Sequence, residues 1–228
     1  RNTLVGGLAG DSLTTGQYNT AIGMFTLSAE DAHGGNTAIG YGALEQQNAG
    51  ADAYNVAVGY IAGNAISTGI NNILVGANAG DALTTGNYNI AVGHAALSTE
   101  DAHGKNTAIG HMALTAQDAG ADGNNVAIGF QAGMTVTTGV YNTLIGGACG
   151  DALSTGAYNV AMGTHALSSE DTGSRNVAIG QGALQSLNYD GNGYNVAVGH
   201  LAGNAVSTGT ENVLIGGLAG DALTTGSM

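Results

Sequence analysis

Thirteen copies of one five-residue motif run through the chain at nearly constant intervals. The motif reads Asn, a β-branched residue, Ala or Leu, then Ile, Val or Met, and finally Gly. Three of every four intervals are equal and the other is slightly longer, and this series recurs, so that four coils make one super-repeat. A fixed period of this kind predicts a solenoid, because a unit this short buries its apolar face only by stacking on its neighbours. The motifs begin at Asn2, Asn19, Asn36, Asn55, Asn72, Asn89, Asn106, Asn125, Asn142, Asn159, Asn176, Asn195 and Asn212.

The repeats leave no stretch for a second kind of domain. Super-repeats cover residues 2–71, 72–141 and 142–211, and one further coil covers 212–228. We therefore expect a single solenoid domain over residues 1–228. Because the chain begins and ends inside the pattern, we expect it to be a segment of a longer fibre.

Each motif predicts a short strand, which makes the expected fold all-β, a parallel β-solenoid of the β-roll or β-helix type. The second position is always Thr, Val or Ile, which favour strands, and the closing Gly can turn the chain with a positive φ. Three apolar or β-branched residues in a row are typical of strands that are covered on both faces. We expect positions two and four to fill the core of each coil, and position three to pack against another copy of the chain.

The asparagine that opens every motif predicts a structural ladder. In stacked, in-register coils, equivalent asparagines lie above one another, and their side-chain amides can hydrogen-bond from coil to coil. We expect this role for all thirteen motif asparagines.

Composition and charge exclude several classes of partner. Charged residues make up 8% of the chain and its net charge is −13. A polyanion would be repelled, so we expect no binding of nucleic acid. No apolar run approaches the roughly 20 residues of a spanning helix, so we expect no membrane insertion. The 43% of apolar residues, in fixed columns, argues for an ordered repeat rather than disorder.

Units such as "NTAIGYGAL", residues 36–44, resemble the repeats of phage tail-fibre shafts and the β-roll repeats of trimeric autotransporter adhesin heads. The resemblance covers all thirteen coils. It implies a homotrimer that is extracellular, at a cell surface or on a virion, and that serves display and attachment. Self-association is the partner that it implies first, with a surface polysaccharide or host receptor as a further partner.

Side chains that could carry chemistry recur with the repeat. His33 and His103 are one super-repeat apart, but Gly173 stands at the third copy, and no histidine pair has the spacing of a zinc site. The acidic pairs at residues 30–31, 100–101 and 170–171 fit turns better than calcium loops. We expect no metal, no cofactor and no enzyme activity. The single cysteine, Cys149, takes an alanine position, and we interpret it as a small buried thiol.

The residue before the motif asparagine is a tyrosine in six coils, and a Gly, Lys, Arg or Glu in several others. Such mixed chemistry predicts an exposed column, and exposed tyrosines can stack on sugar rings. Contact with a glycan is one hypothesis for this column, and aromatic pairing that stiffens the fibre is the other. The six are Tyr18, Tyr54, Tyr88, Tyr141, Tyr158 and Tyr194.

Taken together, the sequence predicts a structural shaft or head segment of a trimeric attachment protein, from a phage tail fibre or a bacterial adhesin. Two alternatives stay open. One is the subunit of a self-assembling cell-surface filament. The other is an ice-binding solenoid, suggested by threonine pairs such as Thr14-Thr15 and Thr84-Thr85, although this array is interrupted at the second and third coils of each super-repeat.

Overall fold

The computed structural model describes residues 1–227 and shows an all-β parallel solenoid of thirteen turns, with no helix in that range. Each turn contributes one strand of three residues, formed by motif positions two to four. The predicted parallel β-solenoid is therefore confirmed. The strands are β1 (Thr3–Val5), β2 (Thr20–Ile22), β3 (Thr37–Ile39), β4 (Val56–Val58), β5 (Ile73–Val75), β6 (Ile90–Val92), β7 (Thr107–Ile109), β8 (Val126–Ile128), β9 (Thr143–Ile145), β10 (Val160–Met162), β11 (Val177–Ile179), β12 (Val196–Val198) and β13 (Val213–Ile215).

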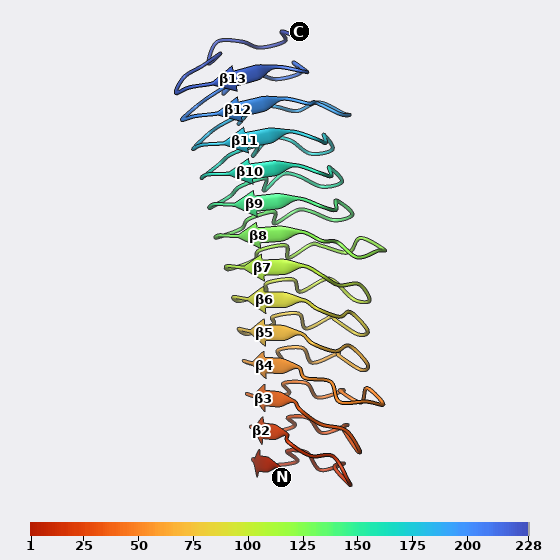
Figure 1. Ribbon diagram of the computed structural model, residues 1–228. Helices are drawn as coiled ribbons and strands as arrows, with labels where there is room; N and C mark the ends of the chain where they lie inside the picture. Colours follow the sequence, from red (N-terminus) through yellow and green to blue (C-terminus); the bar gives the residue numbers. More distant parts are fainter. Residues whose placement is uncertain (228) are drawn as a thin grey trace. The chain divides into compact units, whose positions relative to one another are not determined.

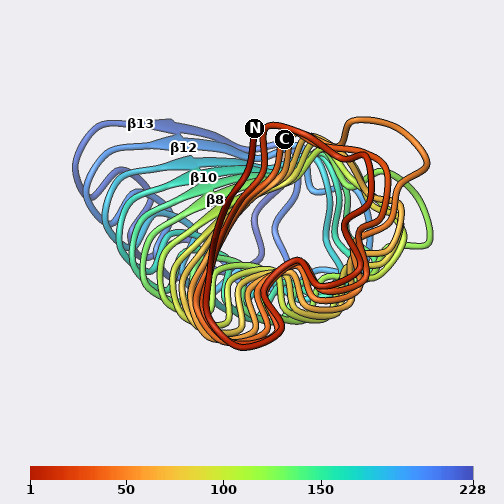
Figure 2. The same ribbon diagram turned by 90° about the horizontal axis from the view of Figure 1, so that it is seen from below.

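The chain divides into two compact units. The first comprises residues 1–111 and 120–122, and the second comprises 112–119 and the residues from 123 onward. Within the first unit β1 to β7 pair in sequence order, and within the second β8 to β13 do the same (Figure 1). Seen along the stack, the turns of the first unit, coloured red to yellow-green, follow similar paths (Figure 2). Equivalent motif positions pair, as Ala91 does with Ala108.

The third motif position points into the core of each turn. Its Ala or Leu is buried in β2 to β12, whereas the second and fourth positions are half-buried or exposed in all of these strands. The prediction that positions two and four fill the core, and that position three faces another chain, is therefore wrong. The interior is already filled by leucines and other apolar residues from the rest of each turn, such as Leu97, Leu114 and Ile66, which are fully buried. The strand contributes only one side chain to that space.

In the first coil of a super-repeat, the leucine at the third motif position packs against a glycine a few residues further along the same turn. The pair that follows the strand is Ala79-Gly80 in one such coil, after Leu74, and Cys149-Gly150 in another, after Leu144. A Cβ on Gly80 would lie 2.8 Å from Leu74 Cδ2, and a Cβ on Gly150 would lie 2.9 Å from Leu144 Cδ2. The leucine therefore occupies the volume that a larger residue at the step would need, which keeps the core close-packed.

The glycine that closes each motif is required by the close stacking of turns. Gly93 has a φ of 138°, in the region that favours glycine, and a Cβ there would lie 2.3 Å from the carbonyl oxygen of Gly110 in the next turn. That distance is far inside van der Waals contact with backbone that cannot move without breaking the ladder. Any side chain at this position would therefore push two turns apart.

We expect Gly93→Ala to lower the free energy of unfolding by about 2 kcal/mol or more, because it adds backbone strain and a clash. Chemical denaturation followed by circular dichroism measures the change. Gly147→Ala is the matched control: a Cβ there has no atom within 4 Å and no positive φ to strain it. Equal losses in the two variants would contradict the assigned role of the motif glycine.

Candidate functional site

The motif asparagines tie backbone groups together along the stack. The backbone N–H of Asn72 donates to Oδ1 of Asn55 at 2.8 Å, and Oδ1 of Asn72 accepts from the N–H of Asn89 at 2.9 Å. Nδ2 of Asn72 donates to the carbonyl of Gly86, at the end of its own turn, at 2.9 Å. An asparagine bonded in this way closes its own turn and fixes the register of the next.

The repeated bond between turns differs from the expected one. The expectation was that side-chain amide bonds to side-chain amide, whereas the recurring contact joins a side-chain oxygen to the backbone N–H of the next asparagine. Side chain to side chain bonds accompany it at some rungs, for example Asn212 Nδ2 to Asn195 Oδ1 at 3.0 Å. The backbone N–H is the stronger constraint because a buried N–H must have an acceptor.

We expect Asn72→Ala to lower the free energy of unfolding by about 2 kcal/mol or more, because it leaves the N–H of Asn89 and the carbonyl of Gly86 without this side chain as partner. Denaturant melts give the value. The neighbouring Asn71→Tyr is the control, since Asn71 is exposed and its column holds tyrosines with the same positive φ. A loss of more than about 0.5 kcal/mol in that control would show that the site is sensitive to any substitution.

The six predicted tyrosines all lie on the surface, between 49% and 63% exposed. Tyr141 and Tyr158 stack on each other with ring centroids 5.0 Å apart and planes at 8°. The guanidinium of Arg175 covers Tyr158 at 5.1 Å from the ring centroid. These contacts cover ring faces that a sugar would need and favour packing between turns. Glycan binding by this column stays a prediction.

A second column of rings, not singled out from the sequence, lies just after the motif glycine. Tyr41 and Tyr60 stack with ring centroids 5.4 Å apart, and Phe25, one position further along its turn, meets Tyr41 edge-on at 5.8 Å. His94 and His111 stack at 5.2 Å with planes at 14°. These rings belong to neighbouring turns of the first unit. Their residue types differ, but all of them are planar side chains that pack from one turn to the next.

The turn at residues 30–33 brings three possible metal ligands together. One oxygen of Glu30, one of Asp31 and a ring nitrogen of His33 lie within 4.8 Å of one another. Glu30 is fully buried: its Oε1 accepts the backbone N–H of His33 at 3.0 Å, and Nδ1 of His33 lies 3.7 Å from that same oxygen. The sequence signal for this group is the recurrence of Glu-Asp-x-His, a pattern that by itself favours turn formation.

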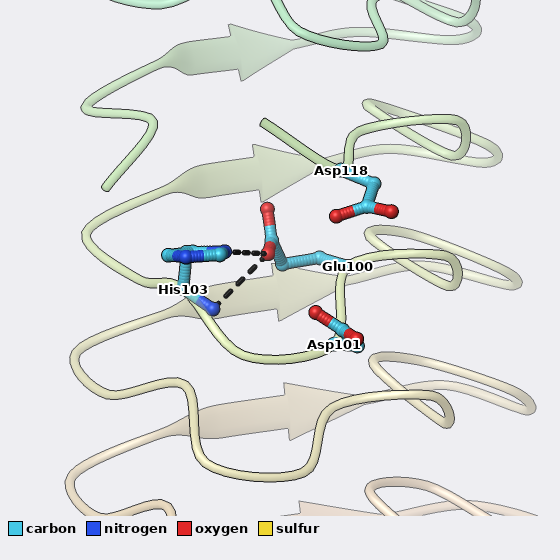
Figure 3. A group of neighbouring side chains, drawn as sticks. All are labelled: Glu100, Asp101, His103 and Asp118. Atoms are coloured by element: carbon cyan, nitrogen blue, oxygen red, sulfur yellow. Dashed lines mark hydrogen bonds and ion pairs between the residues drawn. The ribbon is translucent and has the colours of Figure 1, made fainter. Parts of the chain in front are cut away.

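The same turn recurs one super-repeat later in the first unit. Oε1 of Glu100 accepts the N–H of His103 at 3.1 Å and lies 3.5 Å from His103 Nδ1 (Figure 3). One oxygen of Asp101 again lies within 4.8 Å of these groups. Asp118, also drawn there, belongs to the second unit.

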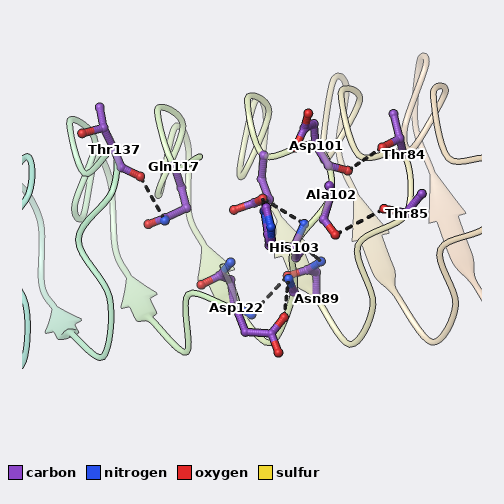
Figure 4. A network of polar contacts seen from close by, with 12 residues as sticks. Thr84, Thr85, Asn89, Asp101, Ala102, His103, Gln117, Asp122 and Thr137 are labelled. Atoms are coloured by element: carbon purple, nitrogen blue, oxygen red, sulfur yellow. Dashed lines mark hydrogen bonds and ion pairs between the residues drawn. The ribbon is translucent and has the colours of Figure 1, made fainter. Parts of the chain in front are cut away.

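Hydrogen bonds from the preceding turn hold this loop in place. Hydroxyl and amide groups of Thr84 donate to the carbonyl oxygen of Asp101, and the hydroxyl of Thr85 donates to that of Ala102 (Figure 4). Within the loop's own turn, Nδ2 of the ladder residue Asn89 donates to the carbonyl of His103. The backbone that carries the acidic and imidazole side chains is therefore fixed by the solenoid itself.

The third copy of the loop, in the second unit, has the carboxyl but not the imidazole. Glu170 is buried, and its two oxygens accept the backbone N–H groups of Gly173 at 2.7 Å and Tyr189 at 3.3 Å. Burial raises the pKa of Glu170 above its usual value, although those N–H donors oppose the shift. Burial likewise raises the pKa of Glu30.

This direction predicts how stability depends on pH. The pKa of Glu170 is higher in the folded chain than in the unfolded one. The free energy of unfolding is therefore lowered as the pH rises through the pKa of the folded chain, because the buried carboxyl loses its proton. Below about pH 4.5 the carboxyl is protonated in both states and this loss is absent. We expect the stability difference between Glu170→Gln and the natural chain to shift in favour of the variant as the pH rises from that value to neutrality. Urea melts across that range measure it. A difference that is constant with pH would contradict the raised pKa.

The outer face of the strands carries an uncharged strip of Val, Ile, Met and Thr side chains in each unit. This outer strip consists of the side chains at the second and fourth motif positions, and none of them carries a charge. Several are strongly exposed, including Ile73 at 43% and Met162 at 37%. The fourth-position members are Val5, Ile22, Ile39, Val58, Val75, Val92, Ile109, Ile128, Ile145, Met162, Ile179, Val198 and Ile215.

Other candidate sites are weak. Cys149 is fully buried, and burial raises the pKa of its thiol to about 12, so it is a poor nucleophile. No pocket occurs among residues 1–227, and no helix in that range has the length and apolar character to cross a membrane. No protein-family model, no curated protein and no solved structure matches the chain.

Proposed function

We propose that this chain is a structural segment, shaft or head, of a homotrimeric attachment fibre that lies outside the cell, at a cell surface or on a virion. The observation that carries the proposal is the outer strip. Every fourth-position member of the strip is Val, Ile or Met, and apolar side chains that stay partly exposed along a sheet face mark an interaction surface. The resemblance of the repeats to tail-fibre shafts and adhesin heads supports the rest.

The covering partner that fits best is another copy of the same chain. Its strip would present side chains with the same spacing, because parallel strands repeat at about 4.8 Å in every copy. A row of Val and Ile can then interdigitate with an identical row over many turns. The strip also has no charges, so two chains of net charge −13 can meet there without like charges at close range. That three copies assemble, rather than two or more than three, is implied by the resemblance of the repeats to tail-fibre shafts and adhesin heads.

The function of such a segment is mechanical. Neighbouring turns are tied together by backbone bonds, asparagine bonds and threonine bonds, so that local opening exposes several unpaired groups at once. A fibre built in this way resists proteolysis and holds a binding tip away from its anchor. Its proposed role involves no enzyme activity, and its proposed external partner is a surface polysaccharide or host receptor.

Ice binding is less well supported by the same side chains. An ice-binding face needs a regular array of free threonine hydroxyls. The hydroxyls of Thr14 and Thr84 instead donate to carbonyl oxygens in the following turn, those of Asp31 and Asp101. The threonines therefore serve the internal ladder.

Light scattering on a size-exclusion column tests the trimer. We expect the mass of three chains, each of 22.2 kDa. A mass of one chain would overturn the proposal, and material in the void volume would favour the filament.

The same measurement on a variant with a charge in the outer strip tests which face assembles. We expect Ile179→Lys to reduce the mass to that of one chain while the far-ultraviolet circular dichroism stays unchanged, because Ile179 points away from the core. Gln181→Lys is the control, since it adds the same charge two residues away at an exposed position outside the strip. If Ile179→Lys remained trimeric, the strip would not be the interface.

A further inference from the structure

We propose that the loop of Glu30, Asp31 and His33 and its copy, the loop of Glu100, Asp101 and His103, each bind one divalent transition-metal ion, of which Zn²⁺ fits the ligand set best. The inference does not depend on the fibre function. It starts from the three side chains of each loop that lie within 4.8 Å of one another.

A second observation that points to a bound ion is a buried carboxylate oxygen of Glu30 that has no hydrogen-bond partner. Glu30 is 0% exposed, its Oε1 accepts the N–H of His33, and its Oε2 has no hydrogen-bond partner. A buried carboxylate oxygen without a donor is costly, and such groups in native proteins are paired or coordinate metals. A cation bound by the Glu30 carboxylate would neutralise that charge.

The imidazole of His33 gives a further observation that fits a bound ion. Nδ1 of His33 is also buried and without a hydrogen-bond partner, and it lies 3.7 Å from Oε1 of Glu30. Ligands at about 2.0–2.2 Å from a tetrahedral zinc ion lie about 3.3–3.6 Å from each other. The 3.7 Å between Nδ1 of His33 and the Glu30 carboxylate is close to that separation. In the copy, Nδ1 of His103 is likewise buried without a hydrogen bond and lies 3.5 Å from Oε1 of Glu100.

The scaffold of the site is already formed before a metal arrives. The carbonyl oxygen of Asp31 accepts the N–H groups of Thr14, Thr15 and Gly16, and the carbonyl of His33 accepts Nδ2 of Asn19. These bonds involve the backbone of the loop, and Asp31 itself is exposed, so that its carboxylate can serve as the third ligand. Preformed backbone lowers the entropy that binding would otherwise cost.

The third copy of the loop shows how the chain handles the same carboxyl without a metal. Gly173 replaces the histidine, and the carboxylate of Glu170 lies over it: a Cβ on Gly173 would lie 2.4 Å from Glu170 Cδ. Both oxygens of Glu170 then accept backbone N–H groups. The loop with His33 leaves an oxygen of Glu30 unpartnered, and the loop without histidine satisfies its carboxylate internally.

The ligand chemistry selects the class of ion. One imidazole nitrogen and two carboxylate oxygens suit zinc and its neighbours among the transition metals, whereas calcium requires six to eight oxygens. Three protein ligands leave a fourth position for water. Because Asp31 and Asp101 are exposed, each loop has one candidate ligand at the surface.

Isothermal titration of the chelator-treated full chain with Zn²⁺ tests the proposal. We expect two ions per chain and a melting temperature that rises with Zn²⁺. His33→Gly should leave one ion per chain, and His33→Gly combined with His103→Gly should leave none. Glycine is the natural residue of the third loop, so circular dichroism should show both variants folded.

His94→Gln is the matched control, because His94 stacks on His111 and offers a rival pair of imidazoles outside the loops. It should still bind two ions. Absence of zinc binding by the natural chain, unchanged stoichiometry in the double variant, or loss of an ion in the control would each overturn the proposal. Equal heats with Ca²⁺ would overturn the choice of a transition metal.

Discussion

The register of one turn on the next is the constraint on which the rest of the structure depends. Three-residue strands alone would allow slippage, but a motif asparagine such as Asn72 accepts the backbone N–H of its successor and closes its own turn through Nδ2. The motif glycine then allows the turns to approach more closely than any side chain would permit. Together these two residues explain why the extra residues of the longer coils, which begin at Asn36, Asn106 and Asn176, lie in a loop and never within the motif.

Fixing the register has a consequence for assembly. Since equivalent positions stack in columns, a property repeated in sequence becomes a shared property of a face. Uncharged second and fourth positions therefore become the outer strip, and third positions become part of a closely packed interior. Columns whose residue type varies from turn to turn lie on the surface. There, neighbouring turns that both carry a ring can stack their rings, as Tyr141 and Tyr158 do.

Departures from the repeat are the places where chemistry can differ between turns. The loops at residues 30–33, 100–103 and 170–173 share a backbone held by the preceding turn, yet they differ at the position of the histidine. With histidine, the buried carboxyl of Glu30 keeps an oxygen without a donor; with Gly173, the carboxyl of Glu170 folds back on the main chain. The solenoid thus provides a constant frame in which a single substitution decides how a buried charge is compensated.

The sequence by itself determined the fold class, the number of turns and the position of every strand, because a strict period with Asn and Gly at its ends places the same residues in register in every turn. It did not determine which way the strands face. Thr107, Ala108 and Ile109 are all compatible with either face, and the size of the interior decides between them. That size depends on residues such as Leu97 and Leu114, which reach the core from the loops. The gathering of the ligand atoms at residues 30–33 likewise depended on the turn's conformation, since spacing alone does not show where side chains point.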